Sequence, residues 1–326
     1  MTIGIALLGT GGIATRGFAP AVRAVAGAEL VAVLSRDRAR GEAFARQFDI
    51  PEVYDDLDAL LRSPRVQAVI VATPDAIHEP QVIAAAAAGV HVLCEKPMTT
   101  TYAGCLRMAE AVRASGITFA MGYTLRFSAA LQRVAELLQA GRLGQVRYAR
   151  LLWAVKGAYG PEAWRAHRPQ AHYWALSAVG THLLDLLRWY FGEPASVGGA
   201  MVRPAYGGPN DELSTLVFDY PGRLVAELTA SVLFAGGNRL ELYGDAGTLV
   251  GENLFGMQAA PPTLTCNGEP VAYPPNNPFV DEVADFVQAI EARRPPRATL
   301  DDGVRNVQIL EAAQQGPLSR PLPPYP

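Results

Sequence analysis

The sequence predicts an α/β protein, with a doubly wound parallel sheet first and an α+β part on an open, largely antiparallel sheet second. Short β-branched runs alternate with helical patterns over the first 120 residues, as in parallel sheets. A glycine-rich turn follows the first run, and later runs alternate apolar and polar residues. A chain of 326 residues fits two domains. We place these at 1–122 and 123–326, and we allow for the last helices packing back on the first domain.

Composition excludes several classes of protein. Hydrophobic residues make up 50% of the chain and charged residues 18%, as in ordinary globular proteins. A formal charge of −3 gives no reason to expect nucleic acid or a membrane as partner. The amino terminus has no basic segment typical of a signal peptide, and no apolar run approaches the roughly 18 residues of a membrane span. Cys94, Cys105 and Cys266 lack metal-ligand spacing and cannot all pair, so we expect a cytoplasmic protein without a metal site.

The expected elements of the first domain follow from periodicity. Apolar runs bounded by turn residues predict strands buried on both faces, and amphipathic stretches between them predict the crossover helices. The predicted strands are Ile3–Leu8, Leu30–Leu34, Ala68–Ala72, Val90–Cys94 and Thr118–Gly122. The predicted helices are Ile13–Val25, Arg38–Phe48, Leu57–Arg62, Pro80–Ala88 and Thr101–Ser115.

Periodicity in the second half of the chain predicts a helix over Leu131–Gln139 that links the two domains, and a helix within 173–190. Pro221-Gly222 and Gly236-Gly237 signal turns between strands. An open sheet face commonly pairs with a second subunit, so we expect a homodimer or homotetramer through this sheet. The proline-rich tail 316–326 is expected to be extended. The predicted strands are Val146–Lys156, Ala195–Arg203, Leu213–Tyr220, Leu224–Phe234 and Asn238–Tyr243.

The segment 9-GTGGIA-14 lies directly after a predicted strand and opens a helix. Gly9 permits a tight turn, and Gly11 lets the backbone approach a pyrophosphate at the helix start. Ala14 keeps helix and strand close. Because strand, loop, helix and second strand occur in the expected order, we predict a dinucleotide site that includes Gly9, Gly11, Gly12 and Ile13.

The end of the second strand indicates which dinucleotide binds. An acidic residue usually meets a free ribose diol there, but this chain has Ser35 and Arg36. Arg36 could pair with a 2′-phosphate or stack on the adenine, and Ser35 could donate a hydrogen bond. We therefore favour NADP. NAD stays the alternative, because Asp37 and Arg38 follow immediately and could turn either way, and the segment could also be a solvated loop of mixed charge.

Two further strand ends carry unusual polar residues. After Ala72 comes 73-TPDAIH-78, and after Cys94 comes 95-EKP-97. Ligands of open α/β sheets bind at the carboxyl ends of strands, so we expect Thr73, Pro74, His78, Glu95 and Lys96 beside the cofactor. A partly desolvated lysine there could relay a proton during hydride transfer; alternatively, Glu95 and Lys96 form a solvated loop pair.

The helix within 173–190 carries His182 and Asp185 on one side, together with Ala178 and Trp189, on a wheel of about 100° per residue. An oriented imidazole on a packed helix suits a general acid/base. The alternative is a polar pair that satisfies itself at the edge of a core.

These motifs together resemble one family. The order G-T-G-G-I-A, T-P-D-x-x-H, E-K-P and G-T-H-x-x-D, with 122-GYTLRF-127, Trp164-Arg165 and 278–296, is similar to the glucose–fructose oxidoreductase, inositol dehydrogenase and rhizopine-catabolism (Gfo/Idh/MocA) family. The resemblance implies an NAD(P)-binding Rossmann domain and a substrate-binding domain that also forms the oligomer. It implies oxidation or reduction of sugars, polyols or related hydroxy and keto compounds, with Lys96 as the active-site lysine and His182 as the acid/base.

The chain departs from the family pattern at Ala178, where an aspartate is common. Asp185, one turn after the histidine, is the candidate to replace it. Tyr173 and Trp174 stand where glycines are usual, which predicts a narrower pocket or a flatter, less polar substrate. Two other functions stay open: a glycoside hydrolase that retains NAD, and a catalytically silent nucleotide-binding protein. The candidate substrate contacts are Tyr123, Arg126, Trp153, Trp164, Arg165, His172 and Tyr173, with His167 a weaker candidate.

Overall fold

The computed structural model describes residues 2–156, 163–167, 171–203, 205–256 and 261–314, and the backbone of 320–321. The chain divides into two compact units. Unit 1 comprises Met1–Phe127 and Asn277–Val304, and unit 2 comprises Ser128–Asn276 and Arg305–Pro326. The first unit therefore extends past the expected boundary at 122 and includes a segment from near the C-terminus.

Unit 1 is built on a six-stranded parallel sheet in the order β3-β2-β1-β4-β5-β6. Because the order runs outward from β1 in both directions, right-handed crossovers place helices on both faces. The fold is the predicted doubly wound sheet. Its strands are β1 (Ile3–Leu8), β2 (Ala28–Leu34), β3 (Glu52–Tyr54), β4 (Ala68–Val71), β5 (His91–Glu95) and β6 (Phe119–Gly122).

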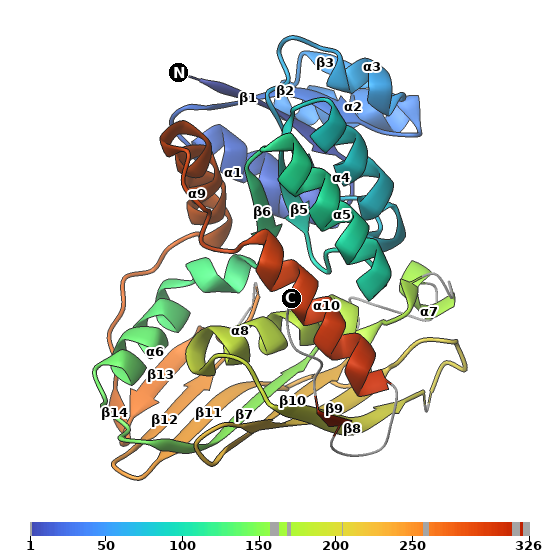
Figure 1. The fold of residues 1–326 in the computed structure, drawn as a ribbon. Coiled ribbons are helices and arrows are strands. Elements are labelled where there is room, and N and C mark those ends of the chain that lie inside the picture. Colours follow the sequence, from blue (N-terminus) through green and yellow to red (C-terminus); the bar gives the residue numbers. More distant parts are fainter. Residues whose placement is uncertain are drawn as a thin grey trace. The chain divides into compact units, whose positions relative to one another are not determined.

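The helices of unit 1 pack as pairs against this sheet. Helix α4 lies beside α5, and α1 beside α9 (Figure 1). Phe18 makes an edge-to-face contact with Phe279 at 5.5 Å, in a core shared by the first crossover and α9. The chain after the second domain thus completes the core of the first unit. The helices are α1 (Ala19–Ala24), α2 (Arg38–Phe48), α3 (Leu57–Leu61), α4 (His78–Ala87), α5 (Tyr102–Ser115) and α9 (Pro278–Ala292).

Unit 2 is built on a nine-stranded sheet in the order β14-β13-β12-β11-β7-β10-β9-β8-β15. Its neighbours pair antiparallel except β10 and β7, which are parallel. The mixed, largely antiparallel sheet is the predicted one. Its strands are β7 (Val146–Ala154), β8 (Ser196–Val202), β9 (Leu213–Tyr220), β10 (Leu224–Ser231), β11 (Asn238–Gly244), β12 (Thr248–Glu252), β13 (Thr263–Cys266), β14 (Glu269–Pro270) and β15 (Arg320–Pro321).

One face of this sheet is covered and the other is open within the unit. Along β9, Leu216 and Phe218 are fully buried, whereas Val217 between them is 40% exposed. The covering helices α6 (Ala129–Gln139) and α8 (Thr181–Phe191) lie over the buried face (Figure 1). The short helix α7 (Trp164–His167) precedes α8, and α10 (Leu300–Gln314) begins in unit 1 and continues in unit 2.

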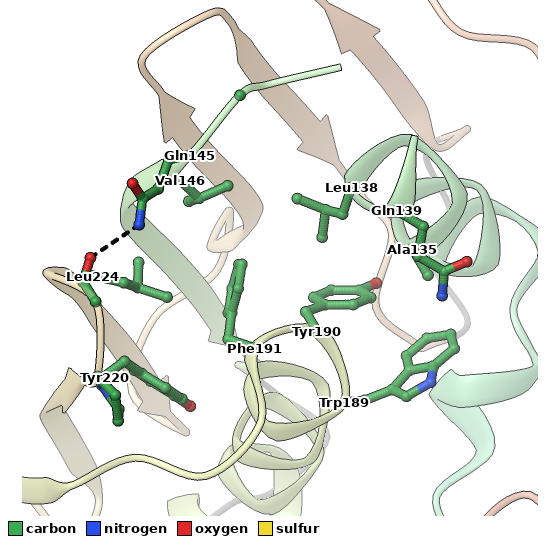
Figure 2. A pocket seen from close by; sticks show the side chains of 13 residues that line it. Ala135, Leu138, Gln139, Gln145, Val146, Trp189, Tyr190, Phe191, Tyr220 and Leu224 are labelled. Carbon is green, nitrogen blue, oxygen red and sulfur yellow. Dashed lines mark hydrogen bonds between the residues drawn. The ribbon is translucent and has the colours of Figure 1, made fainter. Parts of the chain in front are cut away.

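A hollow of about 350 Å³ lies at the C-terminal end of α8, between this helix, α6 and the ends of β7, β9 and β10 (Figure 2). Aromatic side chains dominate its lining: Trp189, Tyr190, Phe191 and Tyr220. None of the predicted site residues lines it, so we do not assign the chemistry to this hollow.

The described residues were searched for membrane-spanning helices and for metal-binding clusters. No helix among them is long and apolar enough to cross a membrane. They contain no cluster of three or more metal-ligating side chains. The tail 316–326 lies outside the described residues apart from the backbone of β15.

Candidate functional site

Strands β1, β4 and β5 are parallel neighbours, so their carboxyl ends meet at one edge of the sheet in unit 1. The glycine-rich loop, the Thr73-Pro74 loop and the Glu95-Lys96 turn leave the sheet at this edge. The structure thus brings together the three segments that the sequence assigns to the cofactor.

The glycine-rich loop is shaped for close approach of another molecule. Gly9 has a φ of 106°, and a Cβ there would lie 2.8 Å from the carbonyl oxygen of Ala72, so only glycine fits. At Gly11 no neighbouring atom lies within 4 Å of the position of a Cβ. At Gly12 the guanidinium of Arg16 lies 2.9 Å from that position. An open backbone beside a guanidinium fits a pyrophosphate.

The adenosine end of the predicted site contains Ser35 at the end of β2, which is buried, and Arg36, which is exposed. The Ser35 hydroxyl donates to the carbonyl oxygen of Asp37 at 2.8 Å. The Asp37 carboxylate caps α2 by accepting from the backbone N–H of Arg40 at 3.0 Å. The Arg40 guanidinium donates to the carbonyl oxygen of Thr10 at 3.1 Å. The sequence analysis did not single out Arg40, which lies in the first turn of α2, four residues after Arg36.

The loop after β4 is fixed by the first turn of α4. The Thr73 hydroxyl donates to Gln81 at 2.6 Å. Both ring nitrogens of His78 lie within hydrogen-bond distance of backbone carbonyls, and the side chain is fully buried. His78 therefore has both ring nitrogens engaged by the loops around it, and its expected contact with the cofactor stays a prediction.

The turn after β5 places a lysine at the sheet edge. The Glu95 side chain is 7% exposed and accepts from the backbone N–H of Lys96 at 2.9 Å. The Lys96–Pro97 peptide bond is cis, and the Lys96 side chain is half-buried. Burial, with the nearby Glu95, Cys105 and Asp75, raises the pKa of the Cys94 thiol, which stays neutral at neutral pH. The half-burial of Lys96 partly withdraws this side chain from water, which favours the proton-transfer role predicted for it.

In unit 2, His182 lies in the first turn of α8 and is 8% exposed. Its ring lies 5.7 Å from that of Trp153 on β7, and Trp153 lies 5.7 Å from Phe255. Asn238 holds Phe255 through two backbone hydrogen bonds of 2.7 and 3.0 Å. The predicted acid/base candidate is therefore set in an aromatic layer.

Asp185, one turn after His182, is 1% exposed and is fixed by α10. Its carboxylate accepts from Asn306 at 3.4 Å, and the Asn306 carbonyl accepts from Arg188 at 2.9 Å. These contacts describe a buried network that ties α8 to α10. They give Asp185 a structural use, and its catalytic role stays a prediction.

The helix that carries His182 begins in a way the sequence did not show. Residues Leu176–Gly180 form a π-helical turn before α8. A π-turn contains more residues per turn than an α-helix, so a uniform wheel misplaces Ala178 relative to His182. The predicted polar stripe is correspondingly buried: Ala178 is 5% exposed.

A buried carboxylate that sequence reasoning missed anchors this π-turn. Asp211 is 2% exposed and accepts from the backbone N–H groups of Trp174 at 2.7 Å and Leu176 at 3.0 Å. The Ser214 hydroxyl adds a third bond of 2.7 Å. Asp211 lies between two predicted strands, in the polar run Asn210, Asp211 and Glu212, and nothing in that pattern signals burial.

Three predicted substrate contacts are largely buried within their own units, and their contact with a substrate stays a prediction. Tyr123 is fully buried. Arg126 makes a two-pronged ion pair with Asp302 at 2.9 and 3.0 Å. Tyr173 is 4% exposed, and its hydroxyl donates to Gln314 at 3.4 Å.

Other substrate candidates remain accessible. Arg165 lies over the ring of Trp164 at 4.5 Å, and both are half-buried. His172 is exposed, with a φ of 58°, and His167 is exposed on α7. Trp174, expected to narrow a pocket, is 1% exposed and packs 5.5 Å from Tyr206.

Comparison with known proteins assigns the chain to a family. Residues 3–123 match a model described as an oxidoreductase family with an NAD-binding Rossmann fold, and residues 131–250 match the GFO/IDH/MocA C-terminal domain. The chain belongs to the Gfo/Idh/MocA family. As a member of this family, it is an NAD(P)-dependent oxidoreductase, as the motifs predicted.

Named relatives span several substrates. A 1,5-anhydro-D-fructose reductase of Ensifer adhaerens is 29% identical, over 95% of this chain and 96% of the reductase. A trans-1,2-dihydrobenzene-1,2-diol dehydrogenase of Mus musculus is 31% identical, over 79% of this chain and 75% of that enzyme. The Gfo/Idh/MocA sequences alone therefore do not single out one substrate.

Solved structures share the fold over the full length. The aldose-aldose oxidoreductase of Caulobacter crescentus, complexed with glycerol, has a TM-score of 0.89 and 27% identity, over 99% of this chain and 100% of that one. A 3-ketoreductase from Actinomadura kijaniata, solved with NADP and TDP-benzene, has a TM-score of 0.85 over 97% of this chain and 98% of that one. At 23% identity, the second shows the fold alone.

Proposed function

We propose that this protein is an NADP-preferring oxidoreductase that moves a hydride between the nicotinamide and a carbinol or carbonyl carbon of a sugar, polyol or related compound. The observation that supports this most is the half-buried Lys96, in the turn that shares a sheet edge with the glycine-rich loop. Ligands of doubly wound sheets bind outside the carboxyl ends of the strands, and Lys96 follows the carboxyl end of β5.

The cofactor, when bound, supplies the hydride chemistry, and the protein manages the proton. In this proposal, Lys96 hydrogen-bonds the reacting oxygen through its amine. His182 exchanges the proton of that oxygen, as a general acid/base. The rings of Trp153 and Phe255 limit water near the imidazole, since both side chains are largely buried.

The NADP preference rests on the charge around the β2 end. Arg16, Arg36 and Arg40 provide three guanidinium groups near the glycine-rich loop or the strand end. The first carboxylate after this strand end in the sequence, Asp37, already caps α2. A 2′-phosphate therefore gains cationic partners without meeting an uncommitted acid.

The aromatic side chains around His182 and the substrates named for the relatives support one class of substrate. Trp153 presents a ring beside the imidazole. Relatives are named for a cyclic anhydro-fructose and for a cyclic diol. We therefore favour a ring compound with a hydroxyl or keto group, whose apolar face can lie on an aromatic side chain.

The decisive experiment replaces Lys96 with Met, which retains a long side chain without the amine. Turnover should fall by about 100-fold or more if the amine acts on the reacting oxygen. The readout is reduced-nicotinamide absorbance over a panel of cyclic sugars, polyols and their keto forms. Unchanged turnover in Lys96→Met would overturn the assignment. Product formation without net change in cofactor redox state would instead favour a closed-cycle hydrolase.

We also propose that the open face of the unit 2 sheet pairs with a second copy of the chain. Arg150 on β7 contacts Glu227 on β10 at 2.7 Å and Glu241 on β11 at 3.5 Å. Charges of alternating sign across neighbouring strands can complement themselves about a two-fold axis. Val217, Val225 and Tyr243 add exposed apolar area to this face. We further propose a cytoplasmic location, since the three cysteines form no disulfide among the described residues.

A further inference from the structure

The hollow at the C-terminal end of α8 lies where the packing of unit 2 opens. Four leucines earlier in this helix are fully buried. The last three residues, Trp189, Tyr190 and Phe191, are only half-buried, and all three line the hollow (Figure 2). Gly192, with a φ of 81°, ends the helix directly after them. A well-packed helix therefore ends in three aromatic side chains that unit 2 covers only in part.

These rings form a continuous wall with Tyr220 of β9. Trp189 stacks on Tyr190, with 5.1 Å between the ring centroids. Phe191 lies edge-on to both Tyr190 and Tyr220, at 6.1 Å from each. The Tyr190 hydroxyl donates to the carbonyl oxygen of Leu131 on α6 at 2.9 Å, which fixes its ring. The wall is thus formed before a ligand arrives, and a preformed site binds at a lower entropic cost.

Glycines in two turns leave the space beside this wall unfilled. Gly144, before β7, and Gly222, between β9 and β10, line the hollow with φ angles of 64° and 90°. Both conformations favour glycine, so no side chain occupies these positions. At about 350 Å³, the hollow lies at the small end of ligand pockets, which measure about 300–1,000 Å³. It therefore suits one small ring compound.

The polar groups of the hollow are neutral. None of the described residues that line it carries a charge, so an anion or a cation meets no opposite charge in the lining. Gln139 of α6 and Gln145, just before β7, contribute amides. The Gln145 amide nitrogen donates to the carbonyl oxygen of Gly222 at 3.1 Å, and the amide oxygen points away from that bond (Figure 2). An amide both donates and accepts hydrogen bonds, as a hydroxyl group does.

Tyr220 adds a polar group that the fold does not use. Its side chain is 3% exposed, and its hydroxyl has no hydrogen-bond partner among the described residues. Burial raises the pKa of this phenol above its ordinary value of 10, so the hydroxyl keeps its proton at neutral pH. Buried polar groups are usually paired, and an unpaired one in the wall of a hollow indicates a polar ligand.

We propose that this hollow is an ancillary binding site for a neutral, hydroxylated ring compound, a sugar or a cyclic polyol. The apolar face of such a ring lies on the aromatic wall, and its hydroxyl groups bond to the amides of Gln139 and Gln145. The proposal does not rest on the proposed function, because neither Lys96 nor His182 lines the hollow.

The unaltered protein tests the proposal by ¹⁹F NMR after labelling with 5-fluorotryptophan. The chain has four tryptophans, and single Trp→Phe variants assign their signals. Trp189 reports on the hollow, Trp153 reports on the surroundings of His182, and Trp174, which is 1% exposed, is the internal reference. Titration with myo-inositol and D-glucose should shift the Trp189 signal with a Kd of about 1–10 mM and leave Trp174 in place. A shift of Trp153 without one of Trp189, or no shift at all, overturns the proposal.

Two further probes test the chemistry of the ligand. D-glucose 6-phosphate should shift the Trp189 signal with a Kd about 5-fold or more above that of D-glucose, because the lining offers no cation to a phosphate. Phenol represents an apolar occupant. Equal or tighter binding of the phosphate, or tighter binding of phenol, contradicts a neutral hydroxylated ligand. A Trp189 signal that depends on protein concentration, and not on these probes, shows instead that a second copy of the chain covers the hollow.

Gln139→Ala tests the amide contact. It removes an exposed side chain from α6 and should raise the Kd for myo-inositol by about 3-fold or more. Glu136→Ala is the matched control, because Glu136 is exposed on the same helix, pairs with Arg133 at 2.7 Å and does not line the hollow. The control should change the Kd by less than about 2-fold. Equal effects of the two variants contradict the proposal. Lys96→Met should leave the Kd at Trp189 unchanged, so this site and the proposed function are tested separately.

Discussion

At the scale of single residues, Arg40 links the two parts of the predicted cofactor site. Its guanidinium reaches the glycine-rich loop at Thr10, from the helix that Asp37 caps. If it also meets the 2′-phosphate, Arg40→Ala should raise the KM for NADP by about 10-fold or more, since a charge-assisted hydrogen bond is worth about 1.5–3 kcal/mol. The KM for NAD should change far less. Steady-state kinetics with each cofactor measures the difference.

Arg38→Ala is the matched control for that prediction. Arg38 lies on the same helix and is exposed, and it pairs with Glu42 at 3.2 Å instead of reaching the loop. Its loss should leave both KM values nearly unchanged, because exposed pairs contribute little. Equal effects of Arg38→Ala and Arg40→Ala on NADP would mean that general surface charge, and not a specific contact, sets the preference.

At the scale of elements, the sequence predicted what local periodicity controls. The strands β1 and β9 have the predicted bounds because their apolar patterns end at turn residues. The three-residue β3 was missed because it is too short to show a period. The π-turn before α8 and the burial of Asp211 were missed because both depend on contacts between segments distant in sequence. Residue types named the candidate chemistry, but only packing showed that Arg126 is already paired.

Asp211 gives a prediction about the element that carries His182. Burial raises the pKa of its carboxyl above the usual 3.8, against the hydrogen bonds from Trp174, Ser214 and Leu176. The folded state therefore holds this proton more tightly than the unfolded chain. The stability that the group contributes falls as pH rises from about 4 toward the raised folded value. Asp211→Asn cannot titrate and should lose this slope.

Asp211→Asn should therefore lower the free energy of unfolding most near pH 4, by about 1–3 kcal/mol for unmade buried bonds. The loss should become smaller as the pH rises above the folded pKa of Asp211. Denaturant unfolding at a series of pH values measures it. Ser214→Ala removes one donor but keeps the titrating carboxyl, so it should retain the wild-type slope. If the free energy of unfolding changes with pH in the same way for wild type and Asp211→Asn, the pKa of Asp211 does not differ between the folded and unfolded states, and the prediction is wrong.

At the scale of the whole molecule, the open face of the unit 2 sheet decides the state of assembly. Val225 is 43% exposed on β10, beside the charges of Glu227 and Arg150. If two copies pair through this face, Val225→Lys places a charged amine in the interface, close to the same lysine of the second copy. That cost of several kcal/mol should shift the protein from dimer or tetramer toward monomer.

Leu106→Lys provides the matched comparison, because Leu106 is 42% exposed on α5 in the other unit. Sedimentation velocity over a range of protein concentrations should show smaller species for Val225→Lys only. A shift with Leu106→Lys, and none with Val225→Lys, would place the subunit contact on unit 1 instead. A wild-type protein that is monomeric at micromolar concentration would remove the sheet face as an interface altogether. The exposed valines would then be ordinary surface residues, since folded proteins expose much apolar area without a partner.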